Sequence, residues 1–165
     1  MATKREVEAE IARIEERLGV GLPREYRAFA LGGMEWDEDK CELQWGPTND
    51  YPHVVDVSCF HPLCEEEPED PDDLSEATLG WYMDLFQSRK PGEGLIPEDA
   101  ISIMGCETHE HVLLFVRGER RGQVWFKEWS RLDEKNIDEP DDGVHFVADN
   151  FDAFLAMLRE PTWED

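Results

Sequence analysis

The sequence predicts a single α+β domain with a mainly antiparallel sheet, a packed N-terminal helix pair, a middle helix and a C-terminal helix. Three observations support this prediction. Two helical patterns open the chain, short strand-like segments joined by turn signals follow around one further helical pattern, and a last helical pattern closes the chain. Helices grouped apart from a run of strands are typical of α+β domains. Strands that follow one another through short turns pair in the antiparallel sense.

Two helices are expected at the start of the chain. Apolar residues repeat along the first at helical spacing, with Thr3 as the expected N-cap and Gly19 as the residue that ends it. The second is expected to begin at Pro23, because proline at the first helical position loses no hydrogen bond, and to end at Gly32 and Gly33. The two apolar faces consist of Val7, Ile11, Ile14, Leu18, Tyr26, Phe29 and Ala30.

Strands, an acidic loop and a helix are expected next. The strands are predicted at Cys41–Trp45 and His53–Phe60, with turn residues between them. The acidic run at 65–73 cannot bury itself and is expected to be a solvated loop. A helix is predicted after it, because apolar residues recur on one face behind a capping-box spacing. That face consists of Leu79, Tyr82, Met83 and Phe86.

A β-meander and a closing helix complete the predicted domain. Gly118 and Gly122 mark a hairpin between the last two meander strands, and a second acidic loop is expected at 133–142. Asp149 or Asn150 is expected to cap the closing helix. We expect one domain over residues 1–160 and a frayed acidic tail at 161–165. The predicted segments are Ala100–Met104, His111–Arg117, Gln123–Trp129 and Val144–Val147 as strands, and a helical face of Phe151, Phe154, Leu155 and Leu158.

The charge of the chain limits the classes of partner. There are 40 Asp and Glu against 16 Lys and Arg, which gives a formal net charge of −24. Nucleic-acid binding depends on Lys and Arg that neutralise phosphates, so direct binding to DNA or RNA is not expected, and neither is binding to an anionic membrane surface. The same charge attracts basic partners and speeds their encounter. Solubility alone is the other explanation of the acidity.

The sequence also bears on location and chemistry. The first ten residues are charged and lack the apolar core of a signal peptide, and no apolar run reaches the roughly 20 residues that span a bilayer. We therefore expect a cytoplasmic protein whose four cysteines are reduced. The sequence contains no nucleophile elbow, phosphate loop or dinucleotide-binding glycine motif. We expect neither an enzyme nor a cofactor.

Three segments resemble the SUKH superfamily, which includes fungal cell-wall-synthesis regulators and bacterial immunity proteins. The first runs from Ile14 to Gly33, with a helix that ends at a glycine, a Leu-Pro start, an aromatic helix and a Gly-Gly stop. The second runs from Ile96-Pro97 through Ile101–Gly105 to Gly122–Trp125, and the third from Val147 to Leu155. One departure follows Gly105, where the family usually has a turn rich in Gly and Asp.

The resemblance implies one α+β domain with helices packed on an antiparallel sheet, and a role in binding another protein. Bacterial members of the superfamily are immunity proteins of polymorphic toxin systems, and they bind and block a cognate toxin that is often a nuclease. A nuclease surrounds its active cleft with Lys and Arg, which the charge of −24 would complement. An intracellular regulatory scaffold of the same fold is the alternative function.

Trp36 is a candidate for partner contact, because three acidic residues follow it. Tryptophan supplies anchoring area at protein interfaces, and the acids would meet basic residues of the partner. A core position for Trp36 at the base of an acidic turn is the alternative. Polar residues near the predicted sheet are further candidates, because ordered backbone would position them. The complete set is Trp36, Asp37, Glu38, Asp39, Glu42, Asp50, Glu107, His109 and Glu110.

Two clusters could hold a metal ion. Glu107, His109 and His111 would share one face of a strand, and two His with one Glu can bind zinc. A small metal-dependent enzyme built on this cluster is a third possible function. The second cluster consists of Cys59, His61 and Cys64. Exposed imidazoles and buried thiols are favoured over a metal, because a structural zinc site needs further ligands that the sequence does not place nearby.

Overall fold

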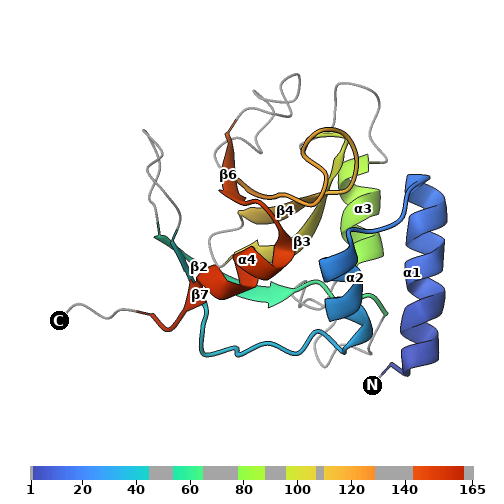
Figure 1. The fold of residues 1–165 in the computed structure, drawn as a ribbon, viewed down its shortest axis with the longest axis horizontal. Helices are drawn as coiled ribbons and strands as arrows, with labels where there is room; N and C mark the ends of the chain where they lie inside the picture. Colours follow the sequence, from blue (N-terminus) through green and yellow to red (C-terminus); the bar gives the residue numbers. More distant parts are fainter. Residues whose placement is uncertain are drawn as a thin grey trace.

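The computed structural model describes residues 2–44, 54–64, 78–87, 96–106, 110–128 and 143–161. Within them the chain forms four helices and seven strands (Figure 1). The acidic loops expected at 65–73 and 133–142 lie outside the described residues, and so does the expected tail except for Pro161. Of the helices within these ranges, none has the length and apolar character needed to cross a bilayer.

The strands join one antiparallel sheet, as the sequence predicts, in the order β6-β5-β4-β3-β2-β1-β7. Neighbours in sequence pair through β3, β4 and β5, which form the expected meander. Register shifts interrupt three of the strand pairs, and such irregularities bend strands. The strands are β1 (Glu42–Gln44), β2 (Val54–Phe60), β3 (Ala100–Cys106), β4 (His111–Phe115), β5 (Val124–Lys127), β6 (Val144–Ala148) and β7 (Leu158–Arg159).

Helix α1 (Lys4–Leu18) confirms the predicted caps. Thr3 accepts a hydrogen bond from the Glu6 backbone, and the Glu6 carboxylate accepts one from the Thr3 backbone, which together form a capping box. Gly19 ends the helix in the left-handed conformation, with φ of 73°. A glycine adopts this conformation without the steric cost that other residues meet.

Two predicted helix bounds are wrong by one residue or more. Helix α2 (Arg24–Leu31) begins after Pro23, because ψ of 136° keeps the proline outside the first turn as the N-cap. Helix α4 (Phe151–Met157) is capped by Asn150, whose side chain accepts from the Ala153 N–H at 2.8 Å. Leu158, expected on the face of this helix, instead turns extended and begins β7 beside β1.

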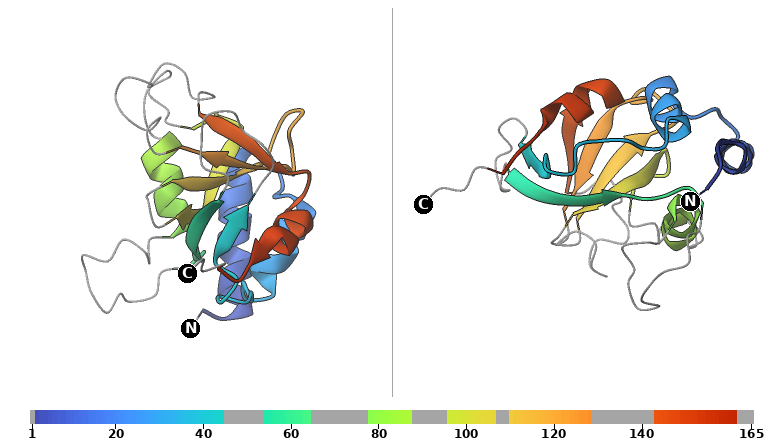
Figure 2. Two further views of the ribbon diagram at one scale, coloured as in Figure 1. Left: turned by 90° about the vertical axis from the view of Figure 1, so that its left-hand side faces the viewer. Right: turned by 90° about the horizontal axis from the view of Figure 1, so that it is seen from below.

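The helices cover both faces of the curled sheet. In the view from below in Figure 2, α2 and α4 lie over one face and α3 (Leu79–Gln87) lies under the other. Residues of β4 alternate between the two faces, as strand geometry requires. Val112 and Leu114 join the main core, whereas Leu113 and Phe115 join a smaller cluster on the opposite side.

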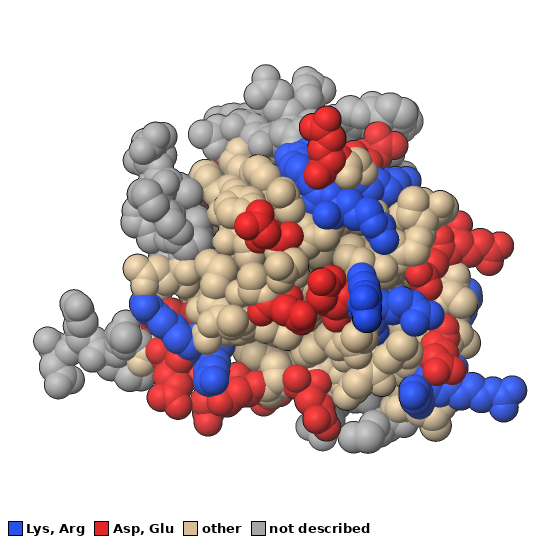
Figure 3. All heavy atoms as spheres, in the orientation of Figure 1, with Lys and Arg blue, Asp and Glu red and all other residues tan. Residues whose placement is uncertain are grey.

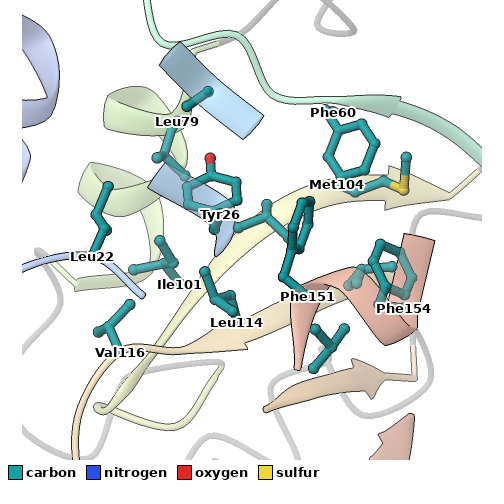
Figure 4. Close-up of a cluster of buried hydrophobic side chains, with 14 of the residues drawn as sticks. Leu22, Tyr26, Phe60, Leu79, Ile101, Met104, Leu114, Val116, Phe151 and Phe154 are labelled. Carbon is teal, nitrogen blue, oxygen red and sulfur yellow. The ribbon is translucent and has the colours of Figure 1, made fainter. Parts of the chain in front are cut away.

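The main core is centred on aromatic residues from helices and sheet (Figure 4). Phe151 is fully buried, and its ring centroid lies 5.4 Å from that of Tyr26, 5.0 Å from Phe29 and 5.9 Å from Phe60. The predicted apolar faces of α1 and α2 belong to this core, since Ile11, Ile14 and Leu18 of α1 are buried in the same cluster as Tyr26 and Ala30 of α2. Trp125 of β5 is half-buried on the other face, 5.8 Å from the ring of Phe115.

Candidate functional site

A groove of about 490 Å³ lies beside the start of α1. It is lined by residues at the start of α1, by the end of α2 with the turn behind it, and by the end of β2 with the residues up to Cys64. In the view from below, Figure 2 shows β2 running toward the N-terminus. Cavities of roughly 300–1,000 Å³ are typical of binding sites, so the groove is the candidate site of this domain.

Trp36 lines the groove, and the end of α2 places it there. Gly33 takes a φ of 89° and Met34 a φ of 55°. The Met34 N–H donates to the Phe29 carbonyl at 3.0 Å, so the chain reverses directly after the helix. Trp36 then packs edge-on against Phe60, with ring centroids 5.4 Å apart and planes at 90°. The half-buried tryptophan combines a core contact with a part that faces the groove.

An acidic turn surrounds Trp36 in the sequence and remains in water. Glu35, Asp37, Glu38 and Asp39 are all exposed. The Asp37 carboxylate accepts the Asp39 N–H at 3.2 Å, and the Asp37 carbonyl accepts the Lys40 N–H at 2.9 Å. These two bonds fix the backbone of the turn. Figure 3 shows acidic side chains gathered along the lower side of the molecule, over the segment that leads from α2 to β1.

Asp37, Glu38 and Asp39 are exposed beside the half-buried Trp36, whereas the other described candidates, Glu42 and Glu110, are buried. Glu42 is 5% exposed, and its carboxylate accepts a hydrogen bond of 2.7 Å from Arg159 Nε across the β1–β7 pair. Glu110 is also buried, and its carbonyl accepts the Cys106 N–H at 3.0 Å. Both residues are therefore part of the folded interior and are not presented on the surface as Asp37, Glu38 and Asp39 are. The remaining candidates, Asp50, Glu107 and His109, lie outside the described residues.

The metal hypotheses gain no support from the part of the chain that the structure describes. No three His, Cys, Asp or Glu side chains within it are arranged to hold a metal ion. Cys59 and Cys64 both line the groove, whereas the ring of His61 stacks on Tyr82 of α3 with centroids 3.7 Å apart. Of the other predicted cluster, His111 alone is described.

A buried polar cluster, which the sequence reasoning missed, links the sheet to α3. The Ser102 hydroxyl lies 3.0 Å from His61 Nε2 and 2.7 Å from His111 Nδ1. A hydroxyl has one proton to donate, so Ser102 donates to one ring and accepts from the other. His61 is 2% exposed, and its Nδ1 has no hydrogen-bond partner among the described residues. Burial, with a smaller effect of His111, lowers the pKa of His61 to about 3.

This cluster is structural in character. The neutral form of His61 dominates at neutral pH, and Ser102 is itself 2% exposed. A serine nucleophile needs an accessible oxygen beside its base, which this burial denies. The sequence could not reveal the cluster, because Ser102 and His111 approach only through the β3–β4 pairing and His61 lies directly after the end of β2.

Only the acidic turn of the groove could be predicted from the sequence, and its apolar floor could not. Its acidic turn follows from consecutive residues, but its floor combines Ala30, Phe60 and Leu63, which are 2%, 6% and 5% exposed. Their apolar character marks them as core candidates and contains no signal for a surface groove. Only the packing of α2 against the end of β2 brings them beneath one opening.

Comparison with known proteins identifies the family. The model of the SMI1 / KNR4 family (SUKH-1) matches residues 7–157 of the 165-residue chain. No curated protein and no solved structure matches the chain. The match covers α1 from Val7 onward, α2, the whole meander and α4, and thus the three segments that resemble the superfamily. The chain belongs to the SMI1/KNR4 (SUKH-1) family.

Proposed function

We propose that this chain is an immunity protein that binds a cognate basic toxin, a nuclease, and neutralises it by occluding its active cleft. The observation on which the proposal depends is a net charge of −24 on a domain of the SUKH-1 family. The family is generally non-catalytic, which supports a binding role.

Electrostatics explains why a nuclease is a suitable partner. A protein that cleaves nucleic acid must neutralise phosphates with Lys and Arg. An acidic protein is attracted to the same cationic surface, and the attraction raises the association rate. Exposed carboxylates at the turn after α2 are held on fixed backbone, as the hydrogen bonds of Asp37 show. Occupation of the cleft by this surface would exclude the substrate.

The proposal is tested by affinity capture from the native host with tagged protein, at low and then high salt. We expect recovery of a basic protein encoded next to this chain, its release as salt rises, and inhibition of its nuclease activity at equimolar ratio. Recovery of cell-wall or signalling proteins in its place would favour the regulatory scaffold. A neighbouring toxin that neither binds nor loses activity would contradict the proposal.

Matched charge variants locate the contact. Replacing Glu35 and Glu38 by Gln removes two charges at the groove, whereas replacing Glu98 and Glu119 by Gln removes two exposed charges near the β4–β5 hairpin. That hairpin lies at the other end of α1, where Arg117 donates to the Leu18 carbonyl at 3.1 Å. A 15-residue helix spans about 22 Å. We expect only the first pair of substitutions to slow association with the toxin markedly.

A further inference from the structure

We propose that the groove beside Trp36 receives one apolar side chain of the partner, carried on a short segment whose flanking Lys and Arg residues pair with Glu35 and Glu38. This inference deepens the proposed function and depends on its statement that the partner is a basic protein. It adds the chemistry of the segment that is recognised and the place where its anchor residue lies.

The floor of the groove is apolar. Ala30, Phe60 and Leu63 line it and belong to the main core, and Met34 and Trp36 add half-buried apolar surface. An apolar side chain that enters would leave water and gain contacts with packed atoms. Buried apolar area contributes about 25 cal/mol per Å², and anchor residues that fill such a recess account for much of the affinity of protein interfaces.

Acidic residues at the rim of the groove favour basic residues on either side of the partner's apolar side chain. Glu35 and Glu38 both line the groove and are exposed, and none of its described lining residues is Lys or Arg. Asp37 and Asp39 extend the same negative turn. A segment with acidic flanks would meet like charges on entry, whereas one with basic flanks gains attraction at short range. The groove is thus matched to an apolar residue within a basic sequence.

The negative charge at the groove also disfavours three other occupants: a second copy of this chain, its own acidic run and a nucleic acid. A second copy of this chain carries the same net charge of −24 and would be repelled. The acidic run at 65–73 would place further carboxylates beside Glu35 and Glu38. A nucleic acid is disfavoured for the same reason. A basic protein segment is the occupant that both the apolar floor and the acidic rim favour.

The groove is organised before the partner arrives. The edge-on contact with Phe60 holds Trp36, and the hydrogen bonds of Met34 and Asp37 hold the backbone on either side of it. A site that is already ordered loses less conformational entropy on binding. The expected recognition is therefore entry of a side chain into a preformed recess.

The experiment uses a fluorescein-labelled peptide, Lys-Arg-Phe-Arg-Lys, and fluorescence anisotropy with the full chain. We expect binding that weakens with salt, and at least tenfold weaker binding when Phe is replaced by Ala or when Lys and Arg are replaced by Ser. Trp36→Ala should weaken binding by tenfold or more. Trp81→Ala is the matched control, because Trp81 is 42% exposed on α3 and does not line the groove.

Two further variants distinguish loss of the groove contact from a folding defect in Trp36→Ala. Trp36→Phe keeps an aromatic contact to Phe60 and should retain binding, and the double variant Glu35→Lys, Glu38→Lys leaves the core intact and should abolish binding. Bound peptide should also slow alkylation of Cys59 and Cys64, which line the groove, without protecting Cys41, which is half-buried and not part of its lining.

The outcomes separate this inference from the proposed function. Equal peptide affinity of wild type and Trp36→Ala, or equal weakening by Trp81→Ala, would overturn the groove inference. The groove inference would also be overturned if a toxin from the host bound Trp36→Ala as tightly as wild type. That result would leave the proposed function, neutralisation of a toxin, unaffected. A free protein that is dimeric and becomes monomeric in Trp36→Ala would assign the groove to a second copy. Specific peptide binding without any toxin in the host would instead contradict the proposed function alone.

Discussion

His61 should make the stability of this domain sensitive to mild acid. The side chain is 2% exposed between the sheet and α3, and burial lowers its pKa from 6.5 to about 3. Between these two pKa values, His61 is therefore protonated in the unfolded chain and neutral in the folded chain. Falling pH then favours unfolding. The stabilisation is complete above about pH 6.5 and decreases by about 1.4 kcal/mol per pH unit down to about pH 3.

The magnitude can be worked out for an accessible interval. Between about pH 7 and about pH 5 the linkage relation gives a loss of about 2 kcal/mol from His61 alone. The free energy of unfolding of a domain is roughly 5–15 kcal/mol, so this loss is a large share of it. The interval stays above the sequence isoelectric point of about 4.4, where loss of net charge would promote precipitation.

Urea denaturation of wild type and His61→Phe, followed by tryptophan fluorescence at both pH values, measures the effect. His61→Phe keeps a ring against Tyr82 but cannot titrate, so its unfolding free energy should fall by about 2 kcal/mol less than that of wild type over the interval. Ser102→Ala is the control, because it removes the hydrogen-bond partner and keeps the titrating ring. A His61→Phe variant with the same pH dependence as wild type would refute the reasoning.

Three other substitutions or probes test the fold. Phe151→Ala should lower the unfolding free energy in urea by about 3–5 kcal/mol, because Phe151 is fully buried in the aromatic core; a loss below about 1 kcal/mol would show that the core tolerates the cavity. Gly19→Ala should cost about 1 kcal/mol, since φ is 73° and no atom crowds an added Cβ, and Gly19→Asn should cost less in a thermal melt. Burial raises the pKa of the Cys106 thiol, so iodoacetamide should modify Cys106 only in urea, while half-buried Cys41 reacts in the native protein, as mass spectrometry would report.

The elements that could be predicted from sequence are those set by neighbouring residues. Thr3 and Gly19 bound α1 in the structure as the capping rules require, because each acts through bonds within a few residues of itself. The antiparallel order of the meander likewise follows from its short connections. The strand β7 could not be predicted, because it has two residues and depends on pairing with β1, which lies more than a hundred residues earlier.

The same distinction applies to the candidate site. The acidic turn at Trp36 follows from consecutive residues, so its local chemistry could be read from the sequence. The recess beneath it depends on contact between the end of α2 and the end of β2, and nothing in the local sequence at Phe60 or Leu63 reports that contact. The pairing of His61 with Ser102 is a second long-range contact of this kind.

Glu38 and Glu42 show why charge read from sequence does not locate a binding surface. Glu38 lies on the segment that leads into the sheet and Glu42 is the first residue of β1, and both are predicted from the sequence to contact a partner. Glu38 is exposed at the groove, whereas Glu42 is 5% exposed and bonded to Arg159. The difference arises because the β1–β7 register sets Glu42 opposite Arg159. A substitution at Glu42 would break this ion pair and leave Arg159 without its partner, so it would weaken partner binding through the fold, whereas one at Glu38 would act on the contact itself.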